Sequence, residues 1–268
     1  MVYVLKFGGN AIRGKSDLDR LSREIAEMIN KGRKIVLVHG GGPEINEELE
    51  KRNIVPKKVG GQRVTDEVTL EVVIHVLEQI NKDVVASLKE AGVNAQRLAG
   101  YDVIRCKKKE PVTVLEDGKT ITADLGKVGD VESVDTTPIM DMLDKGITPV
   151  VFPVSSGPGG KYNVNADTAS GGIAAALKCE EMIQITDVPG ILLNVKDPKS
   201  KLDHVTLKDI EELIRSGIIS GGMIPKVEAC KAVIDAGVEK VRMVNGKDEH
   251  SIITDVLKDI PHGTLITR

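Results

Sequence analysis

The sequence predicts an α/β fold, in which helices cover both faces of a mainly parallel open sheet to give a three-layer αβα sandwich. Strand-like apolar runs alternate with helix-like segments from the N-terminus onward, which is typical of parallel sheets. The first two runs end in the glycine-rich turns Lys6-Phe7-Gly8-Gly9-Asn10 and His39-Gly40-Gly41-Gly42-Pro43. The 268 residues, of which 41% are hydrophobic, suffice for one large domain or for two closely joined lobes.

The first part of the chain alternates between the two element types. Apolar positions three and four residues apart indicate helices, and short apolar runs indicate buried strands. Ser16 and Asp66 are suitable N-caps, and Pro43 suits a first helical turn. The expected elements are a strand at 2–7, a helix capped by Ser16, a strand at 34–38, a short helix opened by Pro43 and a long helix capped by Asp66.

The middle of the chain is richer in strand signals. Residues 112–116, the Asp117-Gly118 turn and residues 120–123 predict a β-hairpin, and a further strand ends at Val131. Such an insert is purely structural as often as it is a lid. We expect it to be a lid over the substrate site.

Alternation resumes from Asp135. Thr206 is suited to cap a helix, and Pro225 is suited to open one that closes at Gly237. The remaining expected elements are a helix from 135 to 145, a strand at 147–154, a Ser-, Gly- and Pro-rich loop at 155–161, a helix at 166–178, a strand at 182–186, a turn at 187–190, the two helices just named, a strand at 241–244, a helix after Asp248 and a strand at 264–267.

Composition narrows the class of protein. The formal net charge is −3, and the run Lys107-Lys108-Lys109 indicates a solvated loop more than a phosphate site. With no Trp, two Phe and three Tyr, base-stacking platforms are scarce, so nucleic acid is not an expected partner. The three cysteines lack CxxC spacing, and no apolar run reaches membrane-span length, which together favour a cytoplasmic protein without a membrane partner.

Two segments indicate phosphate chemistry. A strand that enters consecutive glycines and then a helix exposes backbone N–H groups to an anion, and Lys6 adds a positive charge beside them. In Asn163-Val164-Asn165-Ala166-Asp167, helix capping explains one polar side chain, either Asn165 or Asp167, but not all three. The triple therefore predicts a second role.

A lysine also stands where a helix disfavours it. In Gly221-Gly222-Met223-Ile224-Pro225-Lys226, Lys226 falls in a first helical turn, at the positive end of the helix dipole. An anionic ligand would remove that penalty. Because parallel strands end at one edge of a sheet, we expect Lys6 and Lys226 to converge there.

Familiar phosphate motifs are missing. The chain has no GxxxxGK[ST], no protein-kinase HRD or DFG and no GxGxxG after the first strand, so another scheme is required. We interpret His39 as structural at a strand end and His75 as part of a helix surface or core. Neither histidine is expected to be catalytic.

Seven segments, taken in order, resemble the motifs of the N-acetylglutamate kinases, within the amino acid kinases. The Arg-Val-Thr-Asp and Asn-x-Asn-Ala-Asp segments are specific to the acetylglutamate branch, whereas the glycine turns are shared across amino acid kinases. The segments span nearly the whole chain and are residues 6–10, 39–43, 61–66, 126–129, 162–167, 186–190 and 221–226.

The resemblance implies a single amino acid kinase domain, in which a lobe at 1–154 binds the amino acid and a lobe at 155–268 binds MgATP. The implied reaction is ATP-dependent phosphorylation of the side-chain carboxylate of N-acetyl-L-glutamate in arginine biosynthesis. It yields N-acetyl-L-glutamyl 5-phosphate and ADP. A carboxylate with a pKa near 4.3 is already a nucleophile at neutral pH, so no general base is needed.

The resemblance also implies residue roles, with ATP and Mg²⁺ as cofactors and no protein metal ligands singled out. Lys6 and Lys226 would stabilise the transferred phosphoryl group, and Asp167 would orient both lysines. The implied substrate-binding residues are Gly41, Gly42, Arg63 and Asn163. The implied nucleotide-binding residues are Gly8, Gly9, Thr186, Asp187, Val188, Gly190, Gly222 and Met223.

The sequence departs from the family pattern in the substrate lobe. Gly100-Tyr101-Asp102-Val103 replaces a Gly-x-Asp-Gly segment, and Gln62 replaces a leucine. The sequence therefore predicts the type of reaction more firmly than the identity of the carboxylate substrate. The hexamers of the family that arginine inhibits carry a helix before the first strand, which is not seen before Lys6, so we expect an arginine-insensitive homodimer.

Three rival functions remain. One is a kinase of a related carboxylate such as carrier-linked aminoadipate in lysine biosynthesis, for which Lys107-Lys108-Lys109 could supply a patch for an acidic carrier. Another is a carbamate kinase, although that family lacks the Arg-Val-Thr-Asp segment. The third is a non-catalytic amino acid sensor, which would not need Lys6, Asp167 and Lys226 together.

Overall fold

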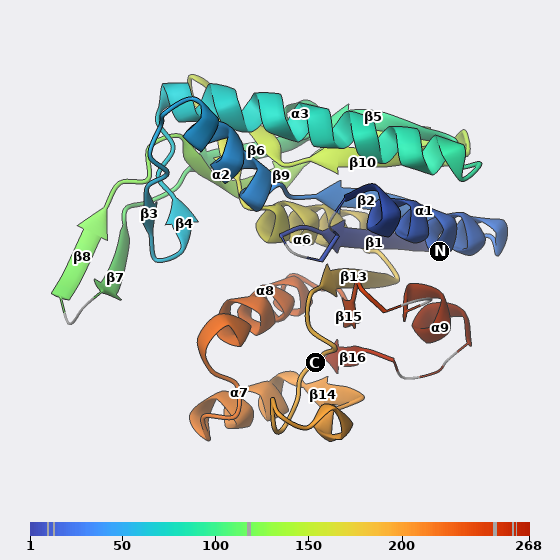
Figure 1. Cartoon of the computed structure of the whole chain (residues 1–268). Helices are drawn as coiled ribbons and strands as arrows, with labels where there is room; N and C mark the ends of the chain where they lie inside the picture. The colour runs from blue at the N-terminus through green and yellow to red at the C-terminus, as the bar shows by residue number, and fades with distance from the viewer. Residues whose placement is uncertain (10, 13, 117–118, 249–250, 259, 261) are drawn as a thin grey trace.

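The computed structural model describes residues 1–9, 11–12, 14–116, 119–248, 251–258, 260 and 262–268. It confirms a mixed α/β architecture built on an eight-stranded central sheet (Figure 1). From one edge to the other, the strands are β14 (His204–Thr206), β16 (Thr264–Thr267), β15 (Val241–Asn245), β13 (Glu181–Thr186), β1 (Val2–Phe7), β2 (Lys34–His39), β10 (Thr148–Phe152) and β5 (Ala95–Ala99). Neighbouring strands are parallel except β15 and β16, which run antiparallel.

Helices cover both faces of this sheet and so form the three expected layers. Alternate residues of β1 face opposite layers: Leu5 packs with residues of α1, α3 and α9, whereas Val4 packs with residues of α5 to α8. The first group is α1 (Gly14–Asn30), α3 (Glu67–Glu90) and α9 (Ser251–Lys258), and the second is α5 (Thr137–Asp144), α6 (Ala166–Leu177), α7 (Leu207–Arg215) and α8 (Ile224–Asp235). The shorter helix α2 (Gly42–Lys51) packs against α3 and Phe152.

A second, small sheet lies beside the central one. Its four strands close on themselves and are β6 (Ile104–Lys108), β9 (Val128–Val134), β11 (Val154–Gly157) and β12 (Gly160–Val164). The short helix α4 (Gly100–Val103) joins β5 to β6. Short 3₁₀ helices follow at η1 (Pro198–Ser200) and η2 (Gly221–Met223).

Two expectations for residues 147–161 are wrong. The predicted strand at 147–154 is two strands in different sheets, because Pro153, which lacks an N–H donor, separates β10 from β11. The predicted loop at 155–161 is instead the antiparallel hairpin of β11 and β12. Gly157 pairs with Gly160 around a Pro158-Gly159 turn, in which Gly159 has a φ of +73°. The same Gly and Pro residues that indicated a loop form the tight turn of this hairpin.

Most predicted helix starts are confirmed. Asp66 accepts a hydrogen bond from the Thr69 N–H at 2.7 Å, and Thr206 forms a capping box with Asp209. Pro43 lies in the first turn of α2 and Pro225 in that of α8. Ser16 is not a cap, because α1 begins two residues earlier, at Gly14.

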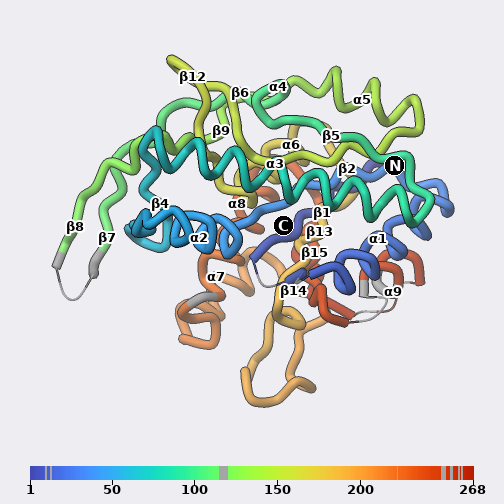
Figure 2. Tube along the Cα trace, turned by 45° about the horizontal axis from the view of Figure 1, so that its top comes forward, coloured from blue at the N-terminus to red at the C-terminus, as the bar shows by residue number. Residues whose placement is uncertain are grey.

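The predicted β-hairpin is present as β7 (Val112–Glu116) and β8 (Lys119–Ala123), although its Asp117-Gly118 turn lies outside the described residues. It projects from the side of the molecule where α2 and β4 (Gln62–Arg63) lie (Figures 1 and 2). At its base, Val114 lies against Gly60, in the turn between β3 (Lys58–Val59) and β4. Within the described residues, no helix is long and apolar enough to cross a bilayer.

Candidate active site

The two glycine-rich turns meet at the carboxyl edge of the central sheet. β1 and β2 are adjacent and parallel, so the turns that follow them lie side by side. The Gly40 N–H donates to Phe7 O at 2.9 Å, and a Cβ on Gly8 would lie 3.3 Å from Gly40 N. Glycine therefore lets the backbones of the two turns approach closely.

The second turn leads directly into the N-terminus of α2. Gly41 is the N-cap and offers no side-chain cap, so the first N–H groups of the ten-residue helix remain available to a ligand. A Cβ on Gly41 would lie 2.5 Å from Ile80 Cδ1, so α3 packs too closely for a larger residue. The start of α2 therefore offers hydrogen-bond donors that suit an anion.

A cavity of about 260 Å³ lies between these turns, the β3–β4 turn and the start of α6. It brings together Lys6, Gly8, Gly9, Gly41, Gly42, Arg63, Asn163 and Asp167, which were predicted from four separate segments of the sequence. The described residues of β7 and β8 do not line it. The sequence did not predict strands β3 and β4. Their turn lies next to the cavity, at the position where the hairpin lid was expected.

Lys6 and Asp167 form an ion pair inside this cavity, with 2.7 Å between Lys6 Nζ and Asp167 Oδ1. The Lys6 side chain is 14% exposed and that of Asp167 is 33% exposed. Asn165 is the N-cap of α6, since its side chain accepts from the Asp167 N–H at 2.7 Å. All three polar residues of this segment line the cavity, and Asn165 also caps the helix.

Arg63 brings an unpaired donor to the same cavity. Its Nη2 donates to Asn46 Oδ1 at 2.6 Å and to Gly42 O at 3.2 Å, which fixes the guanidinium beside the start of α2. Its Nη1 is buried and has no hydrogen-bond partner among the described residues. Burial lowers the pKa of Arg63, but a guanidinium remains charged at neutral pH. A carboxylate is the group that best satisfies such a donor.

His39 holds the second glycine turn through hydrogen bonds. Asn81 Nδ2 donates to His39 Nε2 at 3.0 Å, so we assign the ring proton to Nδ1, which donates to Gly40 O at 3.0 Å. Complete burial lowers the pKa of His39 to about 4. This agrees with the structural interpretation of His39, since the neutral ring holds the turn and does not line the cavity.

The C-terminal candidates lie at the same sheet edge but outside this cavity. Lys226 Nζ donates to Asp187 Oδ1 at 2.7 Å, so in this structure Asp167 pairs with Lys6 and does not orient both lysines. The hydrogen bond from Lys226 lowers the pKa of Asp187. Thr186 accepts from the Val188 N–H at 3.2 Å and so tightens the turn. None of the predicted residues Thr186, Asp187, Val188, Gly190, Gly222 and Met223 lines the cavity that holds Lys6.

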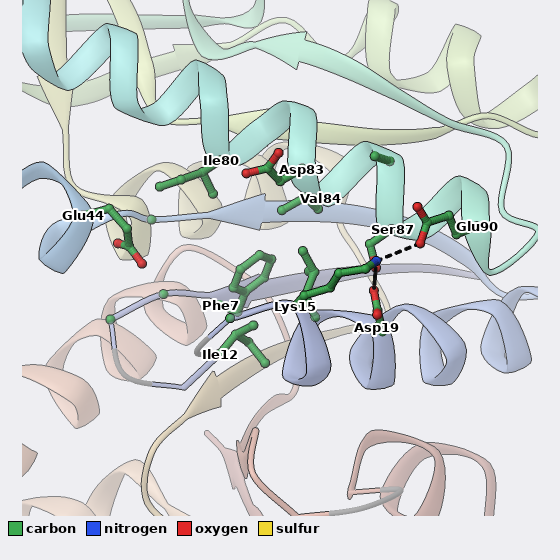
Figure 3. A pocket seen from close by; sticks show the side chains of 16 residues that line it. Phe7, Ile12, Lys15, Asp19, Glu44, Ile80, Asp83, Val84, Ser87 and Glu90 are labelled. Atoms are coloured by element: carbon green, nitrogen blue, oxygen red, sulfur yellow. Dashed lines mark hydrogen bonds and ion pairs between the residues drawn. The ribbon is translucent and has the colours of Figure 1, made fainter. Parts of the chain in front are cut away.

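A second cavity, of about 600 Å³, lies between α1 and α3 on the other side of the glycine turns (Figure 3). Lys15 spans its mouth and donates to Asp19 at 3.2 Å and to Glu90 at 2.9 Å. Sequence reasoning missed this cavity, for which the only local signal was the Lys15 and Asp19 pair at i,i+4. Since acidic side chains outnumber basic ones around it, it does not suit an anion. The smaller cavity is the candidate active site.

Backbone N–H groups at the start of α2, two ion-paired lysines and the Arg63 guanidinium meet at the carboxyl edge of a parallel sheet, an arrangement that suits a small-molecule kinase. The family model described as "Amino acid kinase family" matches residues 1–245, and the chain belongs to that family.

Its relatives agree on the branch. The chain is 39% identical over 270 residues to a protein named acetylglutamate kinase from Methanococcus vannielii, covering 99% of this chain and 92% of the relative. It is 41% identical over 268 residues to one of the same name from Carboxydothermus hydrogenoformans, covering 98% and 91%.

Solved structures share the fold. The protein smu.665 from Streptococcus mutans superposes with a TM-score of 0.76 at 28% identity, covering 99% of this chain and 98% of that one. Carbamate kinase from Giardia lamblia bound to AMP-PNP superposes with a TM-score of 0.69 at 16% identity, covering 99% and 98%. At that identity, the second likeness concerns the fold alone.

Proposed function

We propose that this protein uses ATP to phosphorylate the side-chain carboxylate of N-acetyl-L-glutamate, giving N-acetyl-L-glutamyl 5-phosphate and ADP in arginine biosynthesis. The observation that carries the proposal is the meeting in one cavity of Lys6 and Arg63, whose Nη1 is buried without a hydrogen-bond partner among the described residues. Relatives named acetylglutamate kinase, at about 39% identity over almost the whole chain, support it.

The chemistry needs alignment more than it needs proton transfer. A carboxylate oxygen of the acid attacks the γ-phosphorus of ATP, the bond from that phosphorus to the β,γ-bridging oxygen breaks, and ADP departs with the electron pair. No proton moves, because the nucleophile is already ionised at neutral pH. The protein must therefore hold two anions together and neutralise charge on the transferred group.

The cavity divides this work among its residues. Arg63 and Asn163 would hold the other carboxylate of the acid, and the first N–H groups of α2, at Gly41 and Gly42, would face negative charge. Lys6 would leave Asp167 and turn toward the transferred phosphoryl group, which carries more negative charge than one carboxylate.

We propose the nucleotide site at the ends of β13 and α8, with Lys226 turning from Asp187 to the phosphates. Thr186, Asp187, Val188, Gly190, Gly222 and Met223 would line it beside Gly8 and Gly9. In this proposal, residues 1–154 bind the acid and residues 155–268 bind the nucleotide. The position of Lys226 in the first turn of α8 supports it.

The described residues contain no group of three His, Cys, Asp or Glu side chains that could hold a metal ion. We therefore expect Mg²⁺ to arrive with the nucleotide, since Mg²⁺ keeps water and phosphate oxygens as ligands. Bound in that way, it would neutralise phosphate charge.

Among the rivals, the kinase of a carrier-linked acid loses part of its support. Lys108 pairs with Asp124 and Lys109 with Asp130, both at 2.6 Å, so these ammonium groups already have partners. From the resemblance, we further propose a homodimer. The described cysteines, Cys106, Cys179 and Cys230, are free and buried, which favours a cytoplasmic location.

The proposed reaction is tested by trapping the acyl phosphate with hydroxylamine while ADP release is followed. The acids are N-acetyl-L-glutamate, glutamate, aspartate, N-acetylaminoadipate and carbamate, each with MgATP. Product with N-acetyl-L-glutamate alone is expected. Product with a different acid would refute the substrate, and no product with any of them would refute the proposed reaction and favour the carrier-linked acid or the sensor. Light scattering with and without arginine, and cell fractionation, test the dimer and its location.

A further inference from the structure

Gln184 is a polar residue in a fully buried strand, in which the other two polar residues, Glu181 and Thr186, have hydrogen-bond partners. It lies in β13, which pairs on one side with β1, and its Cα partner there is Lys6. Its side chain is 2% exposed, and its Nε2 has no hydrogen-bond partner among the described residues. An amide with two N–H donors is therefore buried next to the candidate catalytic lysine.

The strand alternation shows which space this amide enters. Ile183 and Ile185 pack in the layer of α1, whereas Met182 packs in the layer of α6 and α8. Gln184 follows Met182 in period two and faces the second layer, as does Lys6, which follows Val4 in the same way. Gln184 and Lys6 are thus neighbours on one sheet face, under α6.

Cys230, on helix α8, belongs to the layer that covers the same sheet face. It is fully buried on α8, and burial raises the pKa of its thiol to about 12, with Asp167 raising it further and Lys6 lowering it. Both charged groups are therefore close to the surface of α8 that covers this sheet face. Lys6 is the common neighbour of Gln184, through the strand register, and of Asp167, through the ion pair.

A buried amide donor without a partner destabilises the folded protein, and an apolar side chain of the same length would not. Such a group fits a protein that uses it in a state other than the resting one. The proposed reaction supplies that state, because Lys6 must turn from Asp167 to the phosphoryl group. Asp167 then loses a donor, while Gln184, the strand neighbour of Lys6, carries a free one.

We propose that Gln184 is a positioning residue whose amide donates to the Asp167 carboxylate when Lys6 turns to the transferred phosphoryl group. The proposal rests on the proposed function, since it assigns a step to the same site. Gln184 acts through Asp167: it keeps that carboxylate in place and so releases the Lys6 ammonium for the reaction. Its hydrogen bond forms only as the reaction proceeds, so it contributes to kcat more than to substrate binding.

The test is Gln184→Met, which keeps the side-chain length and removes the donor. We expect kcat to fall about tenfold, the size of one hydrogen bond to a charged group, with the KM values of both substrates within about twofold. Removal of the unpaired amide should at the same time raise Tm by about 2 to 4 °C. A residue with only a packing role would not give a fall in kcat together with a rise in Tm.

Met182→Leu is the matched control, because it changes packing on the same strand and the same face without an amide. We expect it to leave kcat within about twofold of the wild type. If Gln184→Met does not fold, Gln184→Leu replaces it. A wild-type kcat in the Gln184 variant, or a fall in Tm that parallels the fall in kcat, would overturn the proposal.

A double-mutant cycle tests the route through Asp167. In an Asp167→Asn background, measured with radiolabelled ATP, Gln184→Met should change kcat by less than about twofold. A full tenfold loss there would show that Gln184 acts independently of Asp167 and would overturn the proposal.

This outcome is separate from the proposed function. If the wild type phosphorylates another acid in the panel, the substrate assignment fails, and the cycle is run with that acid. If it phosphorylates none, the melting temperature decides alone, and a Tm that does not rise would overturn the role of the unpaired amide.

Discussion

Acidification should destabilise this protein through one buried histidine, His39. In the folded chain the ring is neutral: Nε2 accepts from Asn81, and Nδ1 donates to Gly40 O. Protonation would place a second ring donor against the Asn81 amide and a charge in a fully buried site. In the unfolded chain the ring protonates freely, so acid favours unfolding.

The magnitude follows from the two pKa values of His39. Burial lowers the pKa from 6.5 to about 4, and each pKa unit corresponds to 1.36 kcal/mol, so the group contributes about 3 kcal/mol to the unfolding free energy. That contribution is complete above pH 6.5, where neither state binds the proton, and it is lost as the pH falls toward 4. Between these limits the unfolding free energy should fall by about 1.4 kcal/mol per pH unit.

The assay is urea unfolding, followed by circular dichroism, at pH 7, 6 and 5. His39→Gln is the matched control, because its amide offers one donor and one acceptor but does not titrate in this range. Carboxylates with lowered pKa values, such as Asp66 and Asp187, also lower the unfolding free energy when they are protonated in acid. Their effect is the same in both proteins and cancels in the comparison. Parallel curves for the wild type and the variant between pH 7 and 5 would refute the reasoning.

Three further predictions concern the site and its scaffold. Lys226→Met should lower kcat by about 10² to 10³, as loss of one charge-stabilising group does, with nucleotide affinity by calorimetry largely kept; an unchanged kcat would exclude a catalytic role. Arg63→Lys should raise the KM for the acid by about tenfold or more with a smaller change in the KM for ATP, since a lysine cannot replace the fork, and equal changes in both would contradict this assignment. Asp66→Ala should lower the unfolding free energy by about 1 kcal/mol through loss of the α3 cap, whereas exposed Glu71→Ala should change it by less than half of that; equal losses would show that the cap is not the cause.

The order of the main strands and helices could be predicted because its signals are local. A cap such as Asp66 and an apolar run such as residues 34–38 depend on neighbours within a few positions. The small closed sheet could not be predicted in the same way. Its β6 and β9 pair through residues such as Cys106 and Val131, and nothing local in either strand specifies that register.

The candidate site was predictable in part for the same reason. Strand ends of a parallel sheet share one edge, so Lys6 and Lys226 were expected to converge there. Both lie at that edge, but only Lys6 lines the cavity, together with the glycine turns and Asp167. The partner of Lys226 was not predictable, because Asp187 follows β13 of the central sheet and Asp167 follows β12 of the small closed sheet, and only the fold decides which carboxylate is nearer. Gln184 left one weak signal, a polar residue in the buried run 181–186.

The two ion pairs also explain how lysines can be held in place and still be free to react. Lys6 with Asp167, and Lys226 with Asp187, each contain a carboxylate that is 33% exposed, and such partly solvated pairs contribute only about 0 to 1 kcal/mol. Little stability is therefore lost when an ammonium leaves its carboxylate. A transferred phosphoryl group offers several charged oxygens in a cavity that excludes more water, where the same ammonium is worth more. In the proposed reaction, each carboxylate would hold its lysine in the resting protein and release it to the more highly charged phosphoryl group.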